Sequence, residues 1–469
     1  MPALPRPDSP TLVRGLTLVA AVAIIVSNVI GTGVFLKARV MTCNVGSPEM
    51  VTLVWVVAGL LSLAGALTYA ELGAMMPRAG GEVNYLGAAY GRRWGFLYGW
   101  MQLLVGKTGS QAAVAVAFAS ALAGAVGGSG LSAPLVSVGA FSLTSLQLVA
   151  VALIAFVTLV NLASVATSGR IATVLTGVKV SLVLGVAAAA FTYVDGTWGH
   201  FGTSGAAGAC ENVPAAARLG IGGFGAAMLA ALWGYDGWNN MALVAGEIQN
   251  PGRNIPRGLF VGVGGVMALY VLVNVAYYFA MSPAEIASVP DGGVVAIEVM
   301  RRVVGPLGVS VMAAGLMASS FGTLHSSALS GARIPYRLAE DGLLPRSLAT
   351  LTPNTRVPIW AVVLQGAWAS VLALSGSFDT LTDYVIFGSW IFYGLTISSV
   401  FVLRRTMPDA ERPYRAWGYP VVPALFLVVT AFLLINTLIT SPTNSLVGLA
   451  LIVLGLPVYA FFNRRSAAA

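Results

Sequence analysis

Charged residues are scarce in this sequence. Asp, Glu, Lys and Arg make up only 9% of its 469 residues, whereas 57% are hydrophobic. Soluble domains carry roughly 25% charged residues, so this composition is typical of a membrane protein and excludes an ordinary soluble domain. The net charge of +8 does not indicate a nucleic-acid partner, because the basic residues are spread over alternate connections between apolar runs.

Histidine and cysteine are also scarce, with two of each in the chain. No HExxH motif occurs, and two histidines leave little for a catalytic triad. The triplet GTG and the run GGFG lack the following Lys-Ser/Thr of a phosphate-binding loop. Two cysteines alone cannot form a zinc site. We therefore expect no enzyme activity, no metal and no cofactor.

The two cysteines, Cys43 and Cys210, both fall in connections that we expect outside the membrane. A disulfide is chemically allowed there. Two unpaired cysteines are the simpler interpretation, and the sequence alone favours it.

Long apolar runs are what the sequence has in abundance. Segments of about 20 apolar residues span a bilayer as helices, whereas a barrel would need short alternating strands. Twelve such runs occur, near residues 16–39, 51–76, 95–124, 146–166, 171–193, 219–245, 257–281, 305–338, 358–375, 381–403, 419–440 and 444–463. They predict an all-α polytopic membrane protein.

The basic residues predict its orientation. If the N-terminus is cytoplasmic, 18 of the 25 Lys and Arg residues fall on the cytoplasmic side, as the positive-inside rule requires. The start MPALPRPDSP has no apolar core before a cleavage site, so no removable signal peptide is expected. Both termini are therefore predicted to be cytoplasmic.

The first ten helices are predicted to form two sets of five, followed by two added helices. The expected parts are a cytoplasmic N-terminus (1–15), the first repeat (16–193), an external loop (194–218), the second repeat (219–403), a cytoplasmic loop (404–418), helices 11 and 12 (419–463) and a cytoplasmic C-terminus (464–469).

Helices 1 and 6 each carry a weak point at mid-depth. Helix 1 contains Gly31-Thr32-Gly33, and helix 6 contains Gly234-Tyr235-Asp236-Gly237. Interrupted hydrophobic segments at corresponding positions of two halves indicate a transporter binding site. A glycine-lined packing face would explain one such triplet, but the matching break in the other half favours a site.

A broken helix suits the zwitterion of an α-amino acid. The N–H groups of Gly31, Thr32 and Gly33 would receive the carboxylate, and the carbonyls of Val29 and Ile30 would receive the ammonium. Trp233 and Tyr235, at the second break, are candidates to close over a side chain, although ordinary packing is the alternative. Asp236 is an acid at membrane depth, which is usually functional.

Three further ionisable residues lie inside predicted spans. Lys179, in helix 5, is too deep for easy snorkelling, and its ammonium could replace a coupling cation at the carbonyls of helix 1. Lys107, in helix 3, is a second intramembrane cation. His325, in helix 8, could titrate near neutral pH or simply pack with a hydrogen bond, and both interpretations stand.

Four stretches resemble the amino acid–polyamine–organocation (APC) superfamily, in particular its L-amino acid transporter branch. They are NVIGTGVF, LTYAELGAMMPRAGGEVNYL, LWGYDGWNN with GEIQNPGRNIP, and ERPYRAWGYPVVPALF. The resemblance covers nearly the whole chain and is nearest to the bacterial serine/threonine exchangers, whose helix 6 also reads Tyr-Asp-Gly-Trp. It implies a fold like that of the bacterial leucine transporter, with helices 1–5 and 6–10 as inverted repeats.

The resemblance also implies roles for individual residues. Trp233 occupies the place of the gating aromatic, and the carbonyls of Gly234 and Asp236 would face the substrate amine. Lys179 matches the helix 5 lysine that stands in for the sodium ion of related symporters. Ser389 and Trp390 match a helix 10 Asn-Trp pair that faces the substrate, with serine in place of asparagine.

Departures from the family pattern concern partners and substrate. The loop GGSGLSAPLVSVGAFS lacks the cysteine through which eukaryotic members join a heavy subunit, so no such partner is expected. Lys107 stands where those members often have arginine, and His325 where many have asparagine. An added cation near the site could favour acidic or polar substrates.

The sequence therefore predicts a sodium-independent exchanger of neutral L-amino acids in a bacterial-type inner membrane, working by alternating access. A proton-coupled symporter and a carrier of acidic or polar amino acids remain open. A sensor that binds amino acids without transport is a more distant alternative, since such a protein normally carries a signalling domain.

Overall fold

A computed structural model of the chain describes residues 12–125, 134–138, 141–163, 165–204, 208–290, 293–375, 378–440 and 442–468. Residues 1–11, where no signal peptide is expected, lie outside this description. So does much of the cysteine-free connection, at residues 126–133 and 139–140.

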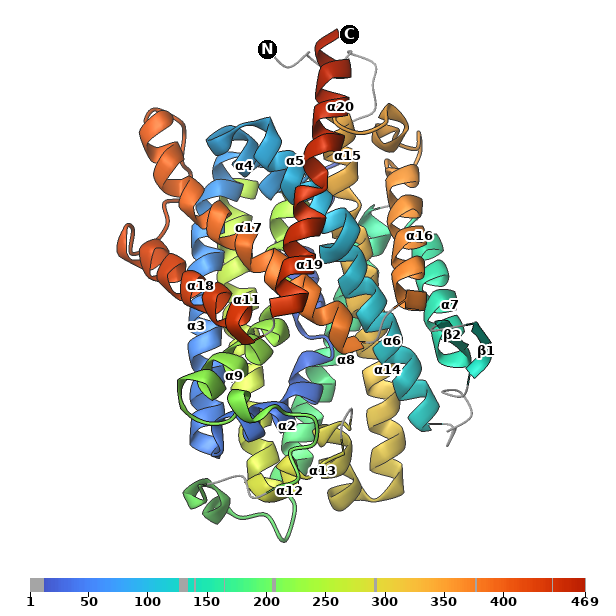
Figure 1. Cartoon of the computed structure of the whole chain (residues 1–469), viewed down its shortest axis with the longest axis vertical. Coiled ribbons are helices and arrows are strands. Elements are labelled where there is room, and N and C mark those ends of the chain that lie inside the picture. The colour runs from blue at the N-terminus through green and yellow to red at the C-terminus, as the bar shows by residue number, and fades with distance from the viewer. Residues whose placement is uncertain are drawn as a thin grey trace.

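Regular structure in the described residues is almost entirely helical (Figure 1). Up to residue 250 the helices are α1 (Leu18–Val29), α2 (Gly33–Val45), α3 (Pro48–Met75), α4 (Glu82–Tyr90), α5 (Arg92–Met101), the π-helix η1 (Gln102–Gly106), α6 (Lys107–Ala125), α7 (Ser145–Val160), α8 (Val165–Phe191), the 3₁₀ turns η3 (Trp198–Gly202) and η4 (Ala215–Ala217), α9 (Gly220–Tyr235), α10 (Asn240–Leu243) and the 3₁₀ turn η5 (Ala245–Glu247). After it come α11 (Pro251–Ala280), α12 (Pro283–Ala287), α13 (Val295–Val304), α14 (Pro306–Gly331), α15 (Arg333–Glu340), the 3₁₀ turn η6 (Arg346–Ala349), α16 (Ile359–Ser375), α17 (Phe378–Thr406), α18 (Val421–Thr440), α19 (Pro442–Val453) and α20 (Gly455–Ala468).

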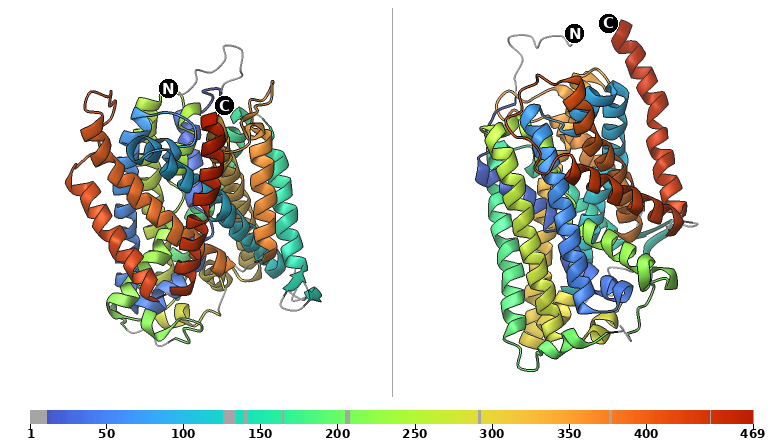
Figure 2. Two further views of the ribbon diagram at one scale, coloured as in Figure 1. Left: turned by 45° about the horizontal axis from the view of Figure 1, so that its top comes forward. Right: turned by 90° about the vertical axis from the view of Figure 1, so that its left-hand side faces the viewer.

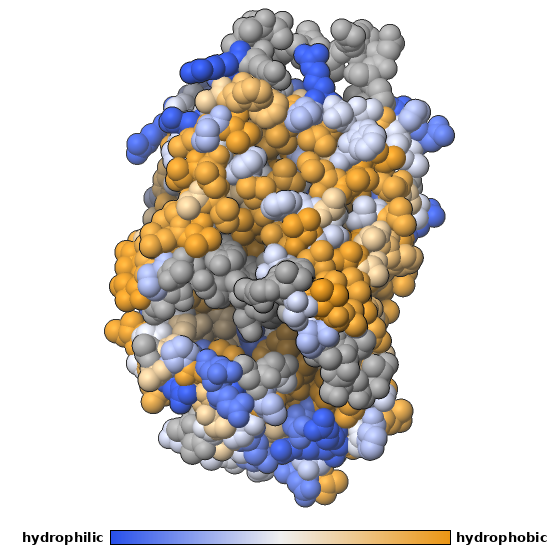
Figure 3. All heavy atoms as spheres, turned by 45° about the vertical axis from the view of Figure 1, so that its right-hand side comes forward, coloured by the Kyte–Doolittle hydropathy of each residue, from blue (hydrophilic) through white to orange (hydrophobic). Residues whose placement is uncertain are grey.

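Each of the twelve predicted apolar runs falls on one helix or on consecutive helices. Within the described residues, seven helices are long and apolar enough to cross a membrane, or eight if α1 and α2 form one bent span. Among the atoms drawn in colour in Figure 3, hydrophobic side chains prevail between the two ends of the face, and hydrophilic ones gather toward both ends. The chain is a multi-pass membrane protein, and the full count of twelve spans stays a prediction.

Helix α18 shows why these helices suit a lipid surface. Apolar side chains recur on its exposed face at helical spacing, where lipid tails would contact them. They are Val421, Leu425, Val428, Phe432, Ile435 and Ile439.

The long helices run roughly along the long axis of the molecule (Figure 2). Helices α4, α5 and α15 lie at one end, and α12 and α13 lie at the other (Figure 1). We call the first of these the α15 end. Helix α20 also finishes at the α15 end.

A small β-hairpin departs from the all-helical expectation. Strands β1 (Pro134–Val138) and β2 (Phe141–Thr144) pair antiparallel between α6 and α7. The side chain of Thr144 then accepts a hydrogen bond from the backbone N–H of Gln147, which starts α7 with a capping box. The hairpin is too short to give a pattern that the sequence alone would reveal.

The expectation of two unpaired cysteines is wrong. Cys43 and Cys210 form a disulfide with Cα atoms 5.8 Å apart. The loop before α9 folds back over the end of α2, where the Leu219 N–H donates to the Asn44 carbonyl at 2.6 Å. The cysteines are 167 residues apart, so only the packed chain reveals their proximity.

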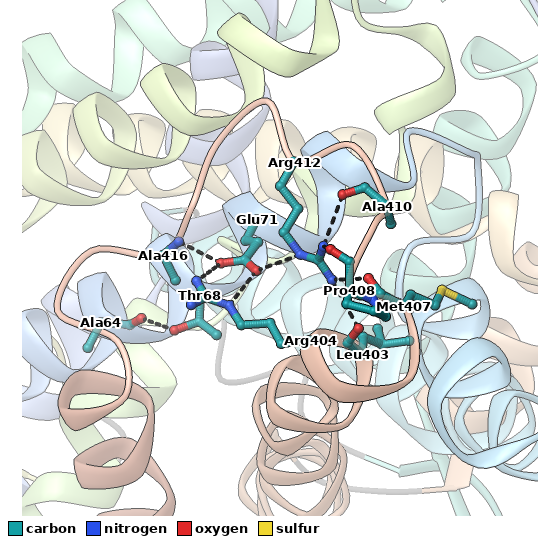
Figure 4. A network of polar contacts seen from close by, with 10 residues as sticks. All are labelled: Ala64, Thr68, Glu71, Leu403, Arg404, Met407, Pro408, Ala410, Arg412 and Ala416. Atoms are coloured by element: carbon teal, nitrogen blue, oxygen red, sulfur yellow. Dashed lines mark hydrogen bonds and ion pairs between the residues drawn. The ribbon is translucent and has the colours of Figure 1, made fainter.

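A buried carboxylate ties α3 to the segment after α17 near the α15 end. Glu71, which is 1% exposed, accepts hydrogen bonds from Arg404 Nε at 2.9 Å and Nη2 at 2.6 Å. It also accepts the backbone N–H of Ala416 at 2.6 Å, and Arg412 Nε lies 3.4 Å away (Figure 4). Burial of a charge requires such pairing, so this network fixes the position of the α17–α18 connection.

Candidate functional site

Helix 1 is broken where the sequence predicts. Helix α1 ends at Val29, α2 begins at Gly33, and the two are bent by 42°. Within the described part of the chain, the N–H groups of Thr32, Gly33 and Val34 make no backbone hydrogen bond, whereas the Gly31 N–H, also a predicted donor to the carboxylate, already donates to the Val29 carbonyl at 2.8 Å. The start of α2 therefore keeps the free donors and partial positive charge that suit a carboxylate.

Helix 6 is broken as well. Helix α9 ends at Tyr235, Asp236 is extended, and Gly237 has a φ of +113° before α10 begins at Asn240. A positive φ favours glycine, so Gly237 permits the turn that redirects the chain.

The two breaks lie in backbone contact. A Cβ atom at Gly33 would lie 2.7 Å from Gly234 Cα, and one at Gly237 would lie 3.0 Å from Asn28 Cβ. Glycine is required at both positions by this close approach. The two interruptions therefore lie side by side at one point of the structure.

Lys179 of α8 contacts the first break directly. Its side chain is buried, and its Nζ donates to the carbonyls of Ser27 at 2.6 Å and Ile30 at 2.7 Å. It also lies 2.6 Å from the hydroxyl of Thr323, on α14. An ammonium surrounded by oxygen atoms at the end of α1 has the surroundings of a bound monovalent cation. Sequence reasoning missed Thr323, because threonine is common on apolar helices.

Tyr270 of α11 joins the two breaks and was also missed. Its hydroxyl lies 2.7 Å from the Val29 carbonyl and 2.9 Å from the Gly234 carbonyl, each at the end of a half-helix. Its ring makes edge contact with Trp55. No local sequence signal marks this tyrosine, because its partners are backbone atoms of two other helices.

These contacts reduce the number of carbonyls that are available to a substrate ammonium. Val29 and Gly234 share Tyr270, and Ile30 accepts from Lys179 and from Ser319 at 3.2 Å. Within the described residues, the Asp236 carbonyl accepts no hydrogen bond. Among the predicted acceptors, it is the one that protein donors leave open in this conformation.

The predicted aromatic residues lie near the breaks but differ in their contacts. Trp233 is 7% exposed and packs with Val105 and Val385, and its Cδ1 would lie 3.4 Å from a Cβ at Gly33. Tyr235 turns the other way and donates its hydroxyl to the Trp55 carbonyl at 3.0 Å. Trp233 is thus the aromatic residue placed beside the first break.

Helix α17 reaches the second break through Tyr393. Its hydroxyl donates to Asp236 Oδ1 at 2.5 Å. The predicted Trp390 is buried against Tyr393 and stacks on Phe426 of α18, and Ser389 is buried beside it in the chain. Trp390 therefore supports Tyr393 in this conformation, a contact that the Asn-Trp comparison did not predict.

Lys107 lies beside the second break. Its Nζ donates to Asn240 Oδ1 at the start of α10, and its charge acts on Asp236. It directly follows the π-helix η1, an irregularity that occurs frequently at functional sites. An acid and a base near one break offset each other's charge.

His325 is placed away from the breaks. Its Nδ1 lies 3.1 Å from Asn161 Nδ2, and its Nε2 lies 3.2 Å from the Ser168 carbonyl. The ring is fully buried and stacks on Phe321. These contacts agree with the packing interpretation of this histidine.

Between the breaks and the α15 end, the chain segments before α1 and after α10 contact each other. The Leu16 N–H donates to the Glu247 carbonyl and the Leu16 carbonyl accepts from the Gln249 N–H, both at 2.9 Å. The Glu247 carboxylate is buried and paired with Arg333 at 2.7 and 2.8 Å. The segments that flank α1 and α10 at this end are therefore bound to each other.

Comparison with known proteins covers nearly the whole length of the chain. The family described as amino acid permease matches residues 16–462. The chain belongs to the amino acid permease family. Its members are transporters and not enzymes, and the match confirms the resemblance to the APC superfamily.

Three relatives illustrate the range of the family. The serine/threonine exchanger SteT of Bacillus subtilis is 30% identical over 461 residues, covering 97% of the permease and 98% of that protein. The b(0,+)-type amino acid transporter 1 of Homo sapiens is 29% identical, covering 97% and 89%. The large neutral amino acids transporter small subunit 2 of Oryctolagus cuniculus is 31% identical, covering 96% and 80%.

Proposed function

We propose that this amino acid transporter exchanges neutral L-amino acids across the membrane by alternating access, without sodium. The observation that carries the proposal is Lys179, whose ammonium contacts the carbonyls of Ser27 and Ile30 at the broken end of α1. A fixed cation there removes the need for a bound sodium ion. The relatedness to an exchanger over nearly both full lengths supports exchange.

The substrate zwitterion would lie between the two breaks. Its carboxylate would accept hydrogen bonds from the N–H groups of Thr32 and Gly33 at the start of α2, because the Gly31 N–H already donates to the Val29 carbonyl at 2.8 Å. Its ammonium would donate to the carbonyl of Asp236 and, on displacing the Tyr270 hydroxyl, to that of Gly234. Binding through the backbone explains recognition of amino acids as a class.

Neutral substrates fit the charge balance of the site. Lys107 and Asp236 lie near each other at the second break and offset one another, so neither charge is left to select a charged side chain. Trp233 would cover the bound side chain. Ser389 and Trp390 would act through Tyr393, which binds Asp236.

The proposed architecture is that of twelve spans, with helices 1–5 and 6–10 as inverted repeats of the leucine-transporter type and two added helices. The α15 end carries the arginine-rich α15 and the start of α5, so we assign it to the cytoplasm of a bacterial-type inner membrane. Both termini would then be cytoplasmic. The disulfide Cys43–Cys210 would lie on the outer side, where oxidation is allowed.

We propose that the chain works alone. One relative is named a small subunit, which implies a larger assembly for that protein. Here the connection between α6 and α7 has no cysteine for a covalent partner.

Counterflow in proteoliposomes tests the proposal with this chain alone. Vesicles loaded with unlabelled serine or leucine should accumulate the labelled amino acid without a sodium gradient, and empty vesicles should not. Strict sodium dependence, or equal uptake into empty vesicles, would overturn exchange. Saturable binding with no flux would point to a sensor.

A further inference from the structure

A buried polar cluster lies next to the second break, on the side of the α15 end. We call it the Glu82 cluster, and its members are Glu82, Tyr69, Tyr98, Asn239 and Thr396. All five are fully buried, although they come from α4, α3, α5, the turn before α10 and α17. None of them belongs to the substrate contacts described above.

The backbone before α4 explains why an acid is held there. Gly80 and Gly81 both have positive φ, which favours glycine. The Gly80 N–H donates to the Leu243 carbonyl at 3.0 Å, and a Cβ at Gly81 would lie 3.0 Å from the Ala242 carbonyl carbon. This tight turn places Glu82, the first residue of α4, against α10.

The cluster has more polar atoms than it has hydrogen bonds. Glu82 Oε1 accepts from Asn239 Nδ2 at 2.7 Å. Within the described residues, Glu82 Oε2, Asn239 Oδ1 and the hydroxyls of Tyr69, Tyr98 and Thr396 make no hydrogen bond of good geometry, although Tyr69 and Tyr98 approach the carboxyl closely enough to act on it. Since each unsatisfied buried group costs about 1–3 kcal/mol, so many in one place indicate a ligand that is a proton or a hydrogen-bonding molecule.

The chemistry of the cluster suits a proton. Tyrosine and threonine hydroxyls both donate and accept, so they can serve an ionised carboxylate as donors and a protonated carboxyl as acceptors. Tyr69 and Tyr98 lie close enough to interact electrostatically with Glu82. The cluster thus offers a hydrogen-bonding partner to either protonation state of Glu82.

The charged and titratable groups around Glu82 come from several elements. Lys107 of α6 interacts electrostatically with Glu82 and also with Asp236. Tyr85 and Tyr393 interact electrostatically with the Glu82 carboxylate as well. The nearby Arg337 of α15 is paired instead with Glu340 and Asp341, at 3.2 and 2.8 Å. Burial raises the pKa of Glu82, against the opposing effects of Asn239, Tyr98 and Lys107.

We propose that Glu82 is a proton-binding site of the transport cycle, with its proton taken from water on the α15 side. The proton binds to Oε2, the oxygen that Asn239 does not contact, and the new O–H donates to a hydroxyl of the cluster. Ionised Glu82 holds Asn239 by a charge-assisted hydrogen bond, and protonation reduces it to a weaker neutral one. The turn that begins α10 is therefore held when Glu82 is ionised and released when Glu82 is protonated. Because the helix 6 break must move during alternating access, exchange is faster when Glu82 is protonated.

An infrared titration of the purified protein tests the proton site without relying on transport. Ordinary glutamates ionise with a pKa of about 4.3. The carbonyl stretch of protonated Glu82 should persist above that pH and vanish as the pH rises further. Glu82→Gln should remove this band. Glu49→Gln, which deletes an exposed acid at the far end of α3, should keep it. No such band in the wild type, or its survival in Glu82→Gln, would overturn the proposal.

The coupling to exchange, which rests on the proposed function, is tested by the pH profile of counterflow with equal pH on both sides. Wild type and Glu49→Gln should speed up as the pH falls, and Glu82→Gln should lose this dependence and stay at the fast rate. If Glu82→Gln does not fold, Tyr98→Phe serves, because loss of the hydroxyl raises the pKa of Glu82 and moves the midpoint to higher pH. An unchanged midpoint in Tyr98→Phe, or a wild-type profile in Glu82→Gln, would overturn the coupling. No counterflow in the wild type at any pH would instead refute exchange.

Discussion

Gly33 and Gly234 lie so close that a side chain on the first would collide with the backbone of the second. A Cβ at Gly33 would lie 2.7 Å from Gly234 Cα and 3.3 Å from Gly234 N. Backbone cannot rotate away as a flexible side chain can. The contact between the two broken helices therefore depends on the absence of a single methyl group.

Gly33→Ala should abolish counterflow. The methyl group would push α2 away from α9 and disturb the free N–H groups at the start of α2, with an overpacking cost of about 1–3 kcal/mol. Gly177→Ala is a matched control, because a Cβ at Gly177 on α8 meets nothing within 4 Å. Transport at the wild-type rate in Gly33→Ala would mean that the break does not bind substrate.

Lys179→Met should reduce counterflow by at least about tenfold. Methionine keeps much of the volume but removes the ammonium from the Ser27 and Ile30 carbonyls, and each hydrogen bond to a charged group contributes about 1.5–3 kcal/mol. Thr173→Val on the same helix is the control, since its hydroxyl bonds only within α8, to Gly169 at 2.9 Å. If sodium restores transport in Lys179→Met, the lysine does stand in for a cation. If transport is undiminished, the lysine plays no part in the site.

Local sequence features predicted two parts of this molecule: the breaks in the apolar helices and the charged side chain buried at the depth of the membrane. Gly31-Thr32-Gly33 and Gly234-Tyr235-Asp236-Gly237 marked the breaks, because glycine inside an apolar helix is costly without a reason. Lys179 was found because an ammonium at mid-membrane needs oxygen partners. These features are visible in one short segment at a time.

The residues that sequence reasoning missed act through contacts between distant segments. Tyr270 and Thr323 bind backbone carbonyls of other helices, and no side-chain partner marks them in the sequence. The disulfide depends on how a loop folds back over α2. Glu82 was read only as part of a family motif, because its burial arises from four other elements that pack around it.

Replacing both cysteines by serine should destabilise the end of the molecule opposite the α15 end. The bond joins residues 167 positions apart, and loss of a native disulfide typically costs about 2–5 kcal/mol. A thermal unfolding scan of the double variant should show a lower midpoint than the wild type. Alkylation followed by mass measurement gives an independent check: the wild type should gain label only after reduction. Labelling without reductant would show that Cys43 and Cys210 are not joined.

Tyr270→Phe should lower the unfolding temperature of the ligand-free protein and increase the rise in that temperature when substrate binds. Without the hydroxyl, the Gly234 carbonyl loses its buried donor, at a cost of about 1–3 kcal/mol, while the Val29 carbonyl keeps the Gly31 N–H. A substrate ammonium can then satisfy a carbonyl that nothing else satisfies, so saturating amino acid should raise the unfolding temperature more than in the wild type. Tyr277→Phe on the same helix is the control, because the buried Tyr277 hydroxyl has no hydrogen-bond partner among the described residues. It should not lower the midpoint, since it removes an unsatisfied buried hydroxyl, and it should leave the ligand shift nearly unchanged. An equal or smaller ligand shift in Tyr270→Phe would show that the ammonium does not compete with Tyr270 for these carbonyls.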